Sequence, residues 1–213
     1  MGSALPYSRE LFHKLARTLA ATGQRLYQQG WSPATSSNYS ARLNTGYCAV
    51  TISGRDKALL TERDVMVVDL QNSPVSEGKP SAETGLHTQL YRRFPEVGAV
   101  LHTHSAACTA LTMHFPEKTE WVLEGYELLK ALGTIKTHDT RLSVKIFPNT
   151  QDIDALARDV DSAMDAGEIE HAYLIRGHGL YTWAKDIDSC YRQIEALETL
   201  FAIELARLQI GAR

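Results

Sequence analysis

The feature that most constrains the fold of this chain is a short apolar run that ends in two histidines, GAVLHTH at 98–104. Such a run predicts a buried strand. Alternate residues of a strand point to the same face of a sheet, so His102 and His104 project together at its carboxyl end. Imidazole is a common metal ligand, and two on one face supply half of a tetrahedral zinc site. The alternative is a pair of surface histidines at a strand end.

A third histidine has a comparable setting. His178 lies in RGHG, directly after a predicted strand at 172–175, and its flanking glycines allow a sharp turn that gives the imidazole access. Three histidines at the ends of separate core strands match the catalytic metal pattern of three protein ligands and an open position. The alternative is an ordinary turn histidine. The other histidines are interpreted as helix-face or loop residues: His13, His87, His114, His138 and His171.

Around these strands the chain alternates between helices and strands, with no repeat, low-complexity tract or linker. The pattern predicts strands at 39–43, 47–52, 65–70, 97–103, 142–147 and 172–175, followed by LYTW. It predicts helices at 8–29, 82–93, 106–113, 124–132, 152–164 and 186–209, with Ser105 as the N-cap of the third. The expected organisation is a single α/β domain over residues 1–213, with a central sheet covered by helices.

Composition excludes several classes of protein. The 213 residues carry 22 Lys plus Arg against 25 Asp plus Glu, so no basic excess indicates a nucleic-acid or membrane-surface partner. No apolar run is long enough to span a membrane, and the N-terminus has no uninterrupted apolar core of signal-peptide type. Cys48, Cys108 and Cys190 are odd in number and lack CxxC spacing, which disfavours a disulfide scaffold and a cysteine zinc cluster. The expected location is the reducing cytoplasm.

Acidic residues near these histidines are candidates for proton transfer. Glu83 follows PSA at a predicted helix start, where the alternative is a carboxylate that merely favours a helix N-terminus. Glu124 and Glu127 lie in EGYELLK, and their spacing does not decide which would be a catalytic acid. The alternative for Glu127 is a solvated residue paired with Lys130.

Small polar segments at loop junctions are candidates for holding phosphate. They are Ser36-Ser37-Asn38, Ser53-Gly54 and Ser81. Hydroxyls, amides and free backbone N–H groups can bind phosphate without a large positive charge. The alternative is plain turn chemistry. Neither GxxxxGK[ST] nor GxGxxG occurs, so no nucleotide site is indicated.

Together these motifs resemble the class II aldolase family of zinc enzymes acting on sugar phosphates, from about Arg9 to Leu208. The matching segments are ATSSNYS (34–40), TISG (51–54), PSAE (80–83), HTHS (102–105) and RGHG (176–179). Within the family, GYELLKAL (125–132), NTQDI (149–153) and RGHGLYTW (176–183) resemble a branch of dehydratases. The resemblance implies a three-layer α/β/α fold with a mainly antiparallel sheet. It also implies a sugar-phosphate substrate and a ring-shaped homo-oligomer, usually a tetramer, with active sites near subunit boundaries.

The resemblance also implies roles for individual residues. One zinc ion per subunit would be bound by His102, His104 and His178, and Glu127 rather than Glu124 would be the catalytic acid/base. The positions where aldolase relatives hold phosphate fall on Asn38, Ser53, Gly54 and Ser81. Glu83 matches the catalytic glutamate of the aldolases. The sequence departs from them at Ser37, where they often carry glycine, and at Ala82, where they often carry a second serine.

Two alternatives to a dehydratase stay open. A sugar-phosphate aldolase or 4-epimerase would typically use a tyrosine near the C-terminus, but the last tyrosine here, Tyr191, lies inside the closing helix. A non-catalytic protein with structural zinc would normally need four protein ligands, often cysteines. Three histidines without a suitable cysteine disfavour that second alternative.

Overall fold

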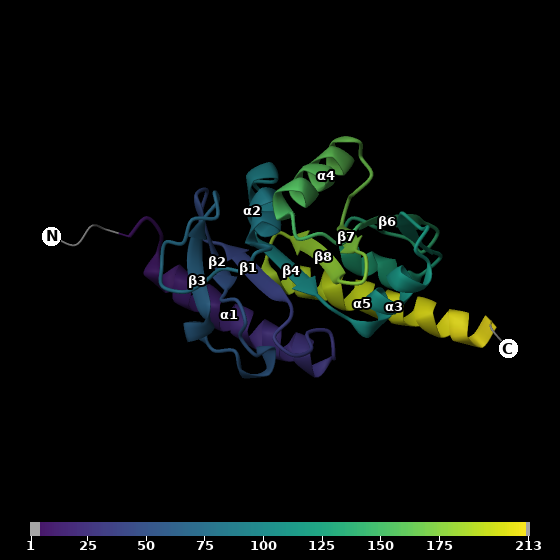
Figure 1. The fold of residues 1–213 in the computed structure, drawn as a ribbon, viewed down its shortest axis with the longest axis horizontal. Coiled ribbons are helices and arrows are strands. Elements are labelled where there is room, and N and C mark those ends of the chain that lie inside the picture. Colours follow the sequence, from purple (N-terminus) through teal and green to yellow (C-terminus); the bar gives the residue numbers. More distant parts are fainter. Residues whose placement is uncertain (1–4, 212–213) are drawn as a thin grey trace.

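Eight strands form one continuous sheet in the order β3-β2-β1-β4-β8-β7-β6-β5 (Figure 1). The computed structural model describes residues 5–211, so the first four and last two residues of the expected 1–213 domain lie outside it. The strands are β1 (Asn38–Arg42), β2 (Tyr47–Thr51), β3 (Val65–Asp69), β4 (Ala99–Thr103), β5 (Glu120–Glu124), β6 (Arg141–Phe147), β7 (Ala172–Ile175) and β8 (Gly179–Ala184).

Strand direction decides which chain segments meet at each edge of the sheet. Among the described strands, neighbours pair antiparallel except β6 and β7, which are parallel. It follows that β2, β4, β6 and β7 all end at the same edge, where β1 and β8 begin. We call this end of the strands the histidine edge, because His102, His104 and His178 lie there. The strands β1, β3, β5 and β8 end at the opposite edge.

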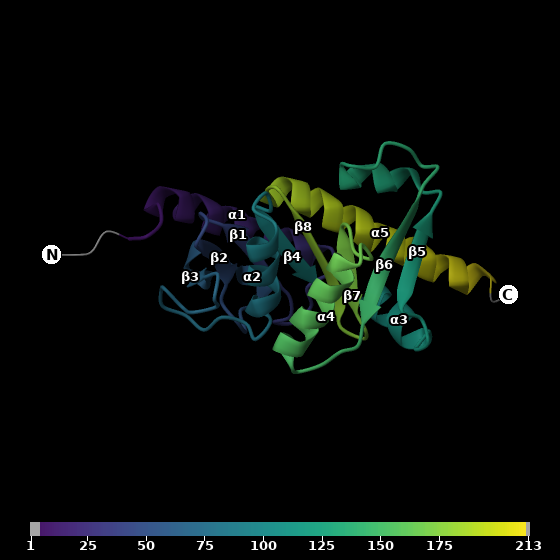
Figure 2. The ribbon, with the colours of Figure 1, turned by 90° about the horizontal axis from the view of Figure 1, so that it is seen from above.

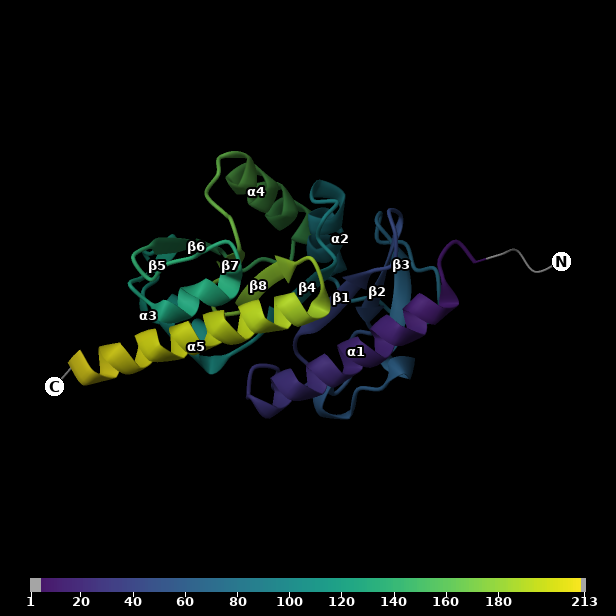
Figure 3. The same ribbon diagram turned by 180° about the vertical axis from the view of Figure 1, so that it is seen from behind.

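Helices cover both faces of this sheet. They are α1 (Arg9–Gln28), α2 (Thr84–Arg93), α3 (Ala106–His114), α4 (Ile153–Asp165) and α5 (Ile187–Gly211), with short 3-10 helices η1 (Lys57–Leu59), η2 (Glu62–Asp64) and η3 (Glu127–Leu132). The helices α1, α3 and α5 pack on one face, and α2 and α4 pack on the other (Figures 1 and 3). The expected three-layer arrangement and the mainly antiparallel sheet are therefore confirmed. No helix within residues 5–211 has the length and apolar character needed to cross a membrane.

Most of the predicted elements are present with ends shifted by at most two residues, and the helical stretch expected over 124–132 is present as the shorter 3-10 helix η3, Glu127–Leu132. The element that was not predicted is the edge strand β5 at residues 120–124, which pairs with β6. Its side chains alternate, with Trp121 and Leu123 buried between exposed glutamates. Gly125 then adopts a φ of 76°, which ends the strand, and only η3 is helical. Glutamate and leucine favour a helix, so the alternation of buried and exposed side chains over residues 120–124 is hard to recognise in the sequence.

Arg176 fastens the turn that carries His178 to the end of α3. Its guanidinium donates to the carbonyl oxygens of Thr112 (2.6 Å), Phe115 (3.1 Å) and Lys118 (2.5 Å). The last carbonyls of a helix have no partner within the helix, and a cation there also opposes the helix dipole. The other end of α3 begins at its N-cap Ser105, as expected, where the Ser105 hydroxyl accepts from the Cys108 N–H at 3.1 Å. Both ends of α3 are thus joined to segments that carry histidines.

The entry into β4 leaves no room for a side chain at Gly98. A Cβ atom there would overlap the carbonyl oxygen of Lys185, because Gly98 runs against the end of β8. We expect Gly98→Ala to lower the free energy of unfolding by about 1–3 kcal/mol, since the backbone must shift, as in overpacked cores. Urea unfolding would measure this loss. Gly46→Ala is the matched control, because the nearest atom to its new Cβ is 3.7 Å away. Equal losses in both variants would contradict the packing argument.

Candidate metal centre

Four side chains from three separate segments converge at the histidine edge. His102 and His104 come from the end of β4, His178 from the turn between β7 and β8, and Glu83 from the residue before α2. One ligand atom from each lies within 4.8 Å of the others. The structure therefore brings together the three histidines singled out from the sequence and adds Glu83. Glu83 is the N-cap residue of α2, but its carboxylate makes no capping hydrogen bond and contacts the histidines instead.

The donor atoms are close enough to share one ion. His178 Nε2 is 2.8 Å from Glu83 Oε1, and His102 Nε2 is 3.5 Å from Glu83 Oε2. The Nε2 atoms of His102 and His178 are 3.3 Å apart. The ring of His104 lies 4.5 Å from each of the other two imidazoles, centroid to centroid.

In His102 and His178, the ring nitrogen that points away from the cluster makes a hydrogen bond. This bond fixes which nitrogen presents a lone pair to the cluster. His102 Nδ1 lies 3.0 Å from the carbonyl oxygen of Leu180, which can only accept, so Nδ1 carries the hydrogen. His178 Nδ1 similarly faces Asn149 Oδ1 at 3.2 Å. In the neutral form of both rings, the two Nε2 lone pairs then face the Glu83 carboxylate. Such an arrangement repels itself unless a cation lies among the donors, and imidazole with carboxylate suits zinc and other first-row divalent ions.

Burial sets the protonation states that metal binding needs. Burial lowers the pKa of His102 to about 3, although the Glu83 carboxylate acts in the opposite direction, so the ring is neutral near pH 7. Burial also raises the pKa of Glu83, but His102, His178 and Asn38 outweigh it and bring that pKa well below its ordinary value. A neutral imidazole and an ionised carboxylate are the forms that coordinate metals.

The HTH segment is also anchored from the other face of the sheet. Thr103, between the two histidines, donates its hydroxyl hydrogen to the Glu198 carboxyl group on α5. Cys108 Sγ lies 3.4 Å from the other oxygen of Glu198, and this carboxyl group is fully buried. Burial raises the pKa of Glu198. The segment that carries His102 and His104 is therefore tied to the long helix behind it.

The candidate phosphate residues gather at the same edge, around the start of α2. The Ser53 N–H donates to the Lys79 carbonyl oxygen at 2.9 Å, which brings Ser53-Gly54 beside the segment carrying Ser81. The Ser81 hydroxyl accepts from the Glu83 N–H at 3.2 Å. Asn38 Nδ2 donates to Glu83 Oε2 at 2.7 Å, so this amide contacts the metal cluster.

Position 37 is one of the two where the sequence departs from the aldolases, because it carries serine where they often carry glycine. Its φ of 72° lies in the left-handed region, which glycine adopts without strain and other residues rarely do. The backbone at this position thus has the conformation that suits the glycine found in aldolase relatives, although the residue is serine.

Two buried residues near the site were not singled out from the sequence. Lys57 is 1% exposed, and its ammonium donates to the carbonyl oxygens of Arg55 (2.7 Å) and Thr35 (3.3 Å). Burial lowers the pKa of Lys57 to about 8, against the opposing effect of Asp56 and Asp64. His87, interpreted as a helix-face residue, lies on α2 but is fully buried. Its spacing of one helical turn from Glu83 is the signal that would have connected the two residues.

Glu127 lies at the opposite edge of the sheet. It follows β5, which is antiparallel to β6 and therefore ends away from the histidine edge (Figure 2). Its side chain is 69% exposed and pairs with Lys130 at 2.5 Å and His138 at 3.4 Å. Glu124, at the end of β5, is exposed at that same edge. Within one chain, the structure brings neither glutamate to the histidines.

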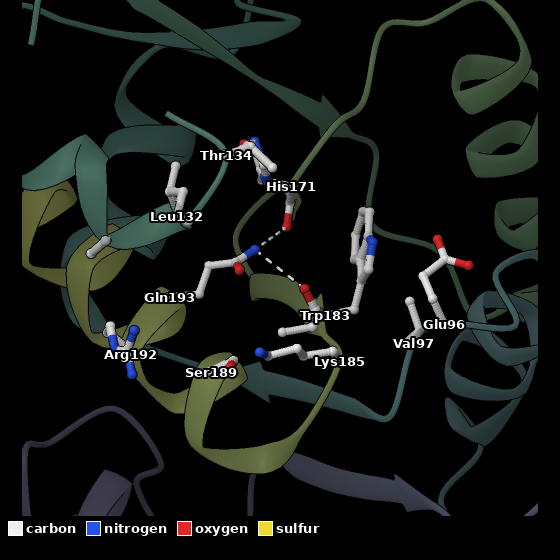
Figure 4. A pocket seen from close by; sticks show the side chains of 13 residues that line it. Glu96, Val97, Leu132, Thr134, His171, Trp183, Lys185, Ser189, Arg192 and Gln193 are labelled. Carbon is white, nitrogen blue, oxygen red and sulfur yellow. Dashed lines mark hydrogen bonds between the residues drawn. The ribbon is translucent and has the colours of Figure 1, made fainter. Parts of the chain in front are cut away.

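A hollow of about 360 Å³ lies at this opposite edge, between η3, the end of β8 and the start of α5 (Figure 4). Gln193 crosses it and donates to the carbonyl oxygen of His171 at 3.2 Å. Lys185 and Arg192 give its rim positive charge (Figure 4). None of the four cluster residues lines it, so this hollow is separate from the candidate metal centre.

Comparisons with known proteins agree with this architecture. Residues 17–205 match the family described as the Class II Aldolase and Adducin N-terminal domain. The methylthioribulose-1-phosphate dehydratase of Alcanivorax borkumensis is 64% identical over 200 residues, covering 94% of each chain. The enzyme of the same name from Marinobacter nauticus is 50% identical over 196 residues, covering 92% of this chain and 94% of the relative. The crystal structure of l-fuculose-1-phosphate aldolase from Thermus thermophilus gives a TM-score of 0.72 at 27% identity, covering 97% of this chain and all of that one.

Removing one imidazole from the cluster should remove the metal. We expect His178→Ala to retain about a tenth or less of the zinc held by the unchanged protein, because only two imidazoles and a carboxylate remain. Metal content after dialysis, measured by mass spectrometry, tests this. The control is His13→Ala, whose imidazole lies on α1 and is 53% exposed. Full zinc content in a folded His178→Ala protein would contradict the ligand set.

Proposed function

The chain belongs to the class II aldolase family, and we propose that it converts 5-methylthioribulose 1-phosphate to 2,3-diketo-5-methylthiopentyl 1-phosphate, a dehydration in methionine salvage. The observation that carries the proposal is the convergence of three histidines and Glu83 beside a group of phosphate-type contacts at one edge of the sheet. The relatives from Alcanivorax borkumensis and Marinobacter nauticus carry the name of this dehydratase, and this name selects the substrate among sugar phosphates.

The centre holds one zinc ion per chain in this proposal, bound by His102, His104 and His178, with Glu83 beside it as the fourth candidate donor. The bound ion supplies a Lewis acid that stabilises negative charge on the substrate oxygens as the proton leaves C3. The residues of the chain provide the geometry for this. The bonds from His102 to Leu180 and from His178 to Asn149 hold both imidazoles with their lone pairs inward.

Glu83 takes the C3 proton in this mechanism. It is the carboxylate that lies among the donors, and its Oε1 faces His178 while two groups hold Oε2: Asn38 at 2.7 Å and the Tyr181 hydroxyl at 3.1 Å. An ionised carboxylate is able to accept a proton, and because Asn38 and Tyr181 both donate to Oε2, the proton is accepted at Oε1 beside His178. The aldolases use the glutamate at the matching position for catalysis, which supports this role.

Glu127 donates the proton that lets the C4 hydroxyl leave as water. Because Glu127 and the histidines lie at opposite edges of one chain, the acid of each centre comes from a neighbouring copy in a homo-oligomer. Contacts between two different surfaces close into a ring when the rotation between copies permits, and a tetrameric ring is the proposed assembly. Lys130 lowers the pKa of the exposed Glu127 in the single chain. Burial at the contact between copies would raise that pKa, as a general acid requires.

The phosphate of the substrate binds where the loops after β2 and before α2 meet. The Ser53 hydroxyl, the Gly54 N–H, the Ser81 hydroxyl and the Asn38 amide are the proposed contacts, because the Ser53 N–H already donates to the Lys79 carbonyl oxygen. Lys57 lies between the loops at 35 and 55 and has no carboxylate within 4 Å among the described residues. It therefore adds positive charge beneath this region, which favours a phosphate.

The cytoplasm is the proposed location, because its reducing conditions keep thiols free. Cys48, Cys108 and Cys190 all lie in the described part of the chain, and all are buried free thiols. An aldolase or 4-epimerase acting on a related sugar phosphate is the alternative function. The presence of Glu83 in the cluster is the observation that favours it, and the products formed from 5-methylthioribulose 1-phosphate separate the two.

Replacing Glu127 tests both the acid and its origin. We expect Glu127→Gln to lower kcat by about 10²-fold or more with normal zinc content, because the amide keeps the shape but delivers no proton. Diketone formation measures kcat. Mixing Glu127→Gln with His102→Ala chains under conditions that exchange subunits should restore activity, since a site with intact histidines then meets an intact Glu127.

The control is Glu124→Gln, which should leave turnover within a few-fold of the unchanged protein. Loss of turnover in Glu124→Gln but not in Glu127→Gln would assign the acid to Glu124. Failure of the mixture to recover activity, in subunits shown to exchange, would contradict an acid supplied by a neighbouring copy.

Removing the Ser81 hydroxyl should weaken substrate binding. We expect Ser81→Ala to raise KM by about 10-fold with little change in kcat, because one hydrogen bond to a charged group is lost in ground and transition states alike. Ser76→Ala is the control, since that hydroxyl makes its contact with the backbone of β3 instead. Unchanged kinetics in Ser81→Ala would place the phosphate elsewhere.

A further inference from the structure

A continuous line of hydrogen bonds runs from the Glu83 carboxylate into the interior between α2 and β1. Its members alternate between the two elements: Glu83, Asn38, His87, Ser40 and Tyr91. Residues 83, 87 and 91 are one helical turn apart, and residues 38 and 40 share one face of a strand. The line is therefore built from two regular elements rather than from loops.

Every bond in this line is short, and every bond behind the one at Glu83 is hidden from water. Asn38 Nδ2 lies 2.7 Å from Glu83 Oε2, and His87 Nε2 bonds to Asn38 Oδ1. Ser40 Oγ is 2.7 Å from His87 Nδ1 and 2.8 Å from the Tyr91 hydroxyl. Each of the four residues behind Glu83 is at most 5% exposed. Water does not compete for these groups, so each depends on its neighbours in the line.

Only one direction of donation satisfies the whole line. The ionised Glu83 can only accept, so the Asn38 amide must present its NH₂ to the carboxylate and its oxygen to His87. That oxygen in turn requires a hydrogen on His87 Nε2, which leaves Nδ1 to accept from the Ser40 hydroxyl. Ser40 then accepts from the Tyr91 hydroxyl.

Burial agrees with this assignment, because it lowers the pKa of His87 to about 4 and keeps the ring neutral. A doubly protonated ring would donate from both nitrogens. It would reverse the Ser40 bond and leave the Tyr91 hydroxyl hydrogen without an acceptor in the line.

We propose that His87 is a positioning residue for Glu83: it fixes the Asn38 amide, and the amide fixes the carboxylate with Oε1 facing His178. An asparagine side chain can turn over and exchange its oxygen and nitrogen, and the Nε2–H of His87 selects between the two orientations. The wrong orientation would set the amide oxygen against the carboxylate and repel it. This inference rests on the metal centre of the proposed function, and not on the dehydration itself.

The test is the zinc affinity of the full-length chain, measured by competition with a chelator. We expect His87→Phe, which keeps a ring beside Tyr181 but has no donor, to bind zinc about 10- to 100-fold more weakly, the usual effect of losing a partner behind a ligand. His87→Gln retains a side-chain N–H and should recover most of the affinity. His171→Phe is the matched control, because His171 is an imidazole of similarly low exposure at the opposite edge.

A double-mutant cycle separates positioning from general support of the fold. If His87 acts through Glu83, then His87→Phe should cause no further loss of zinc affinity in a Glu83→Gln background. Additive losses, or zinc binding by His87→Phe equal to that of the unchanged chain, would overturn the proposal.

A nitrogen-15 NMR spectrum of the unchanged, metal-free protein gives a second test of the proposal. This test does not depend on the folding of any variant. His87 should appear as the neutral ring with hydrogen on Nε2, and a ring with hydrogen on Nδ1 would overturn the proposal. Neither measurement requires turnover. A chain that fails to dehydrate the substrate would refute the proposed function. The zinc affinity and the His87 tautomer would still test the positioning role of His87.

Discussion

The hydrogen bond from His102 Nδ1 to the carbonyl oxygen of Leu180 is the constraint on which the candidate centre depends. It crosses from β4 to β8 in the middle of the sheet, and the His102 ring also stacks on Tyr181 at 3.9 Å. With Nδ1 committed to a carbonyl, Nε2 must offer a lone pair to the cluster. The first donor is thus held by two paired central strands, and the other donors are arranged around it by segments that meet at the same edge.

The single parallel pairing in the described sheet serves that arrangement. Because β6 and β7 run in the same direction, the residues that follow both strands meet at the histidine edge. Asn149 after β6 therefore reaches Nδ1 of His178 after β7. Parallel neighbours need a crossover connection, and α4 provides it while covering the same face as α2. An antiparallel hairpin at this point would have left His178 without its partner.

The sequence was most informative where chemistry and periodicity coincide. The strand ending in His102 and His104 combines an apolar run with two ligands, so both its burial and its clustering with His178 could be predicted. Glu83 was a candidate acid near the histidines and matched the aldolase glutamate, but its contact with the cluster depends on α2 beginning beside β1, which is a tertiary contact. The burial of His87 and Lys57 also follows from neighbours far away in the chain. The strand at 120–124 was not predicted for a different reason, since local helix preference opposed a short alternation that pairing with β6 favours.

Arg176 has a consequence for how this chain can change over evolution. It holds the turn of His178 through carbonyl oxygens alone at Phe115 and Lys118, whereas Thr112 also accepts from the Gly177 N–H through its side chain. A carbonyl oxygen is the same in every residue type. Substitutions at 115 and 118 can therefore accumulate among descendants without loosening the turn, while Thr112 and Arg176 are expected to stay fixed. The side chains at 115 and 118 contact Trp121 instead, so divergence in this stretch would record changes in that packing rather than a change of reaction.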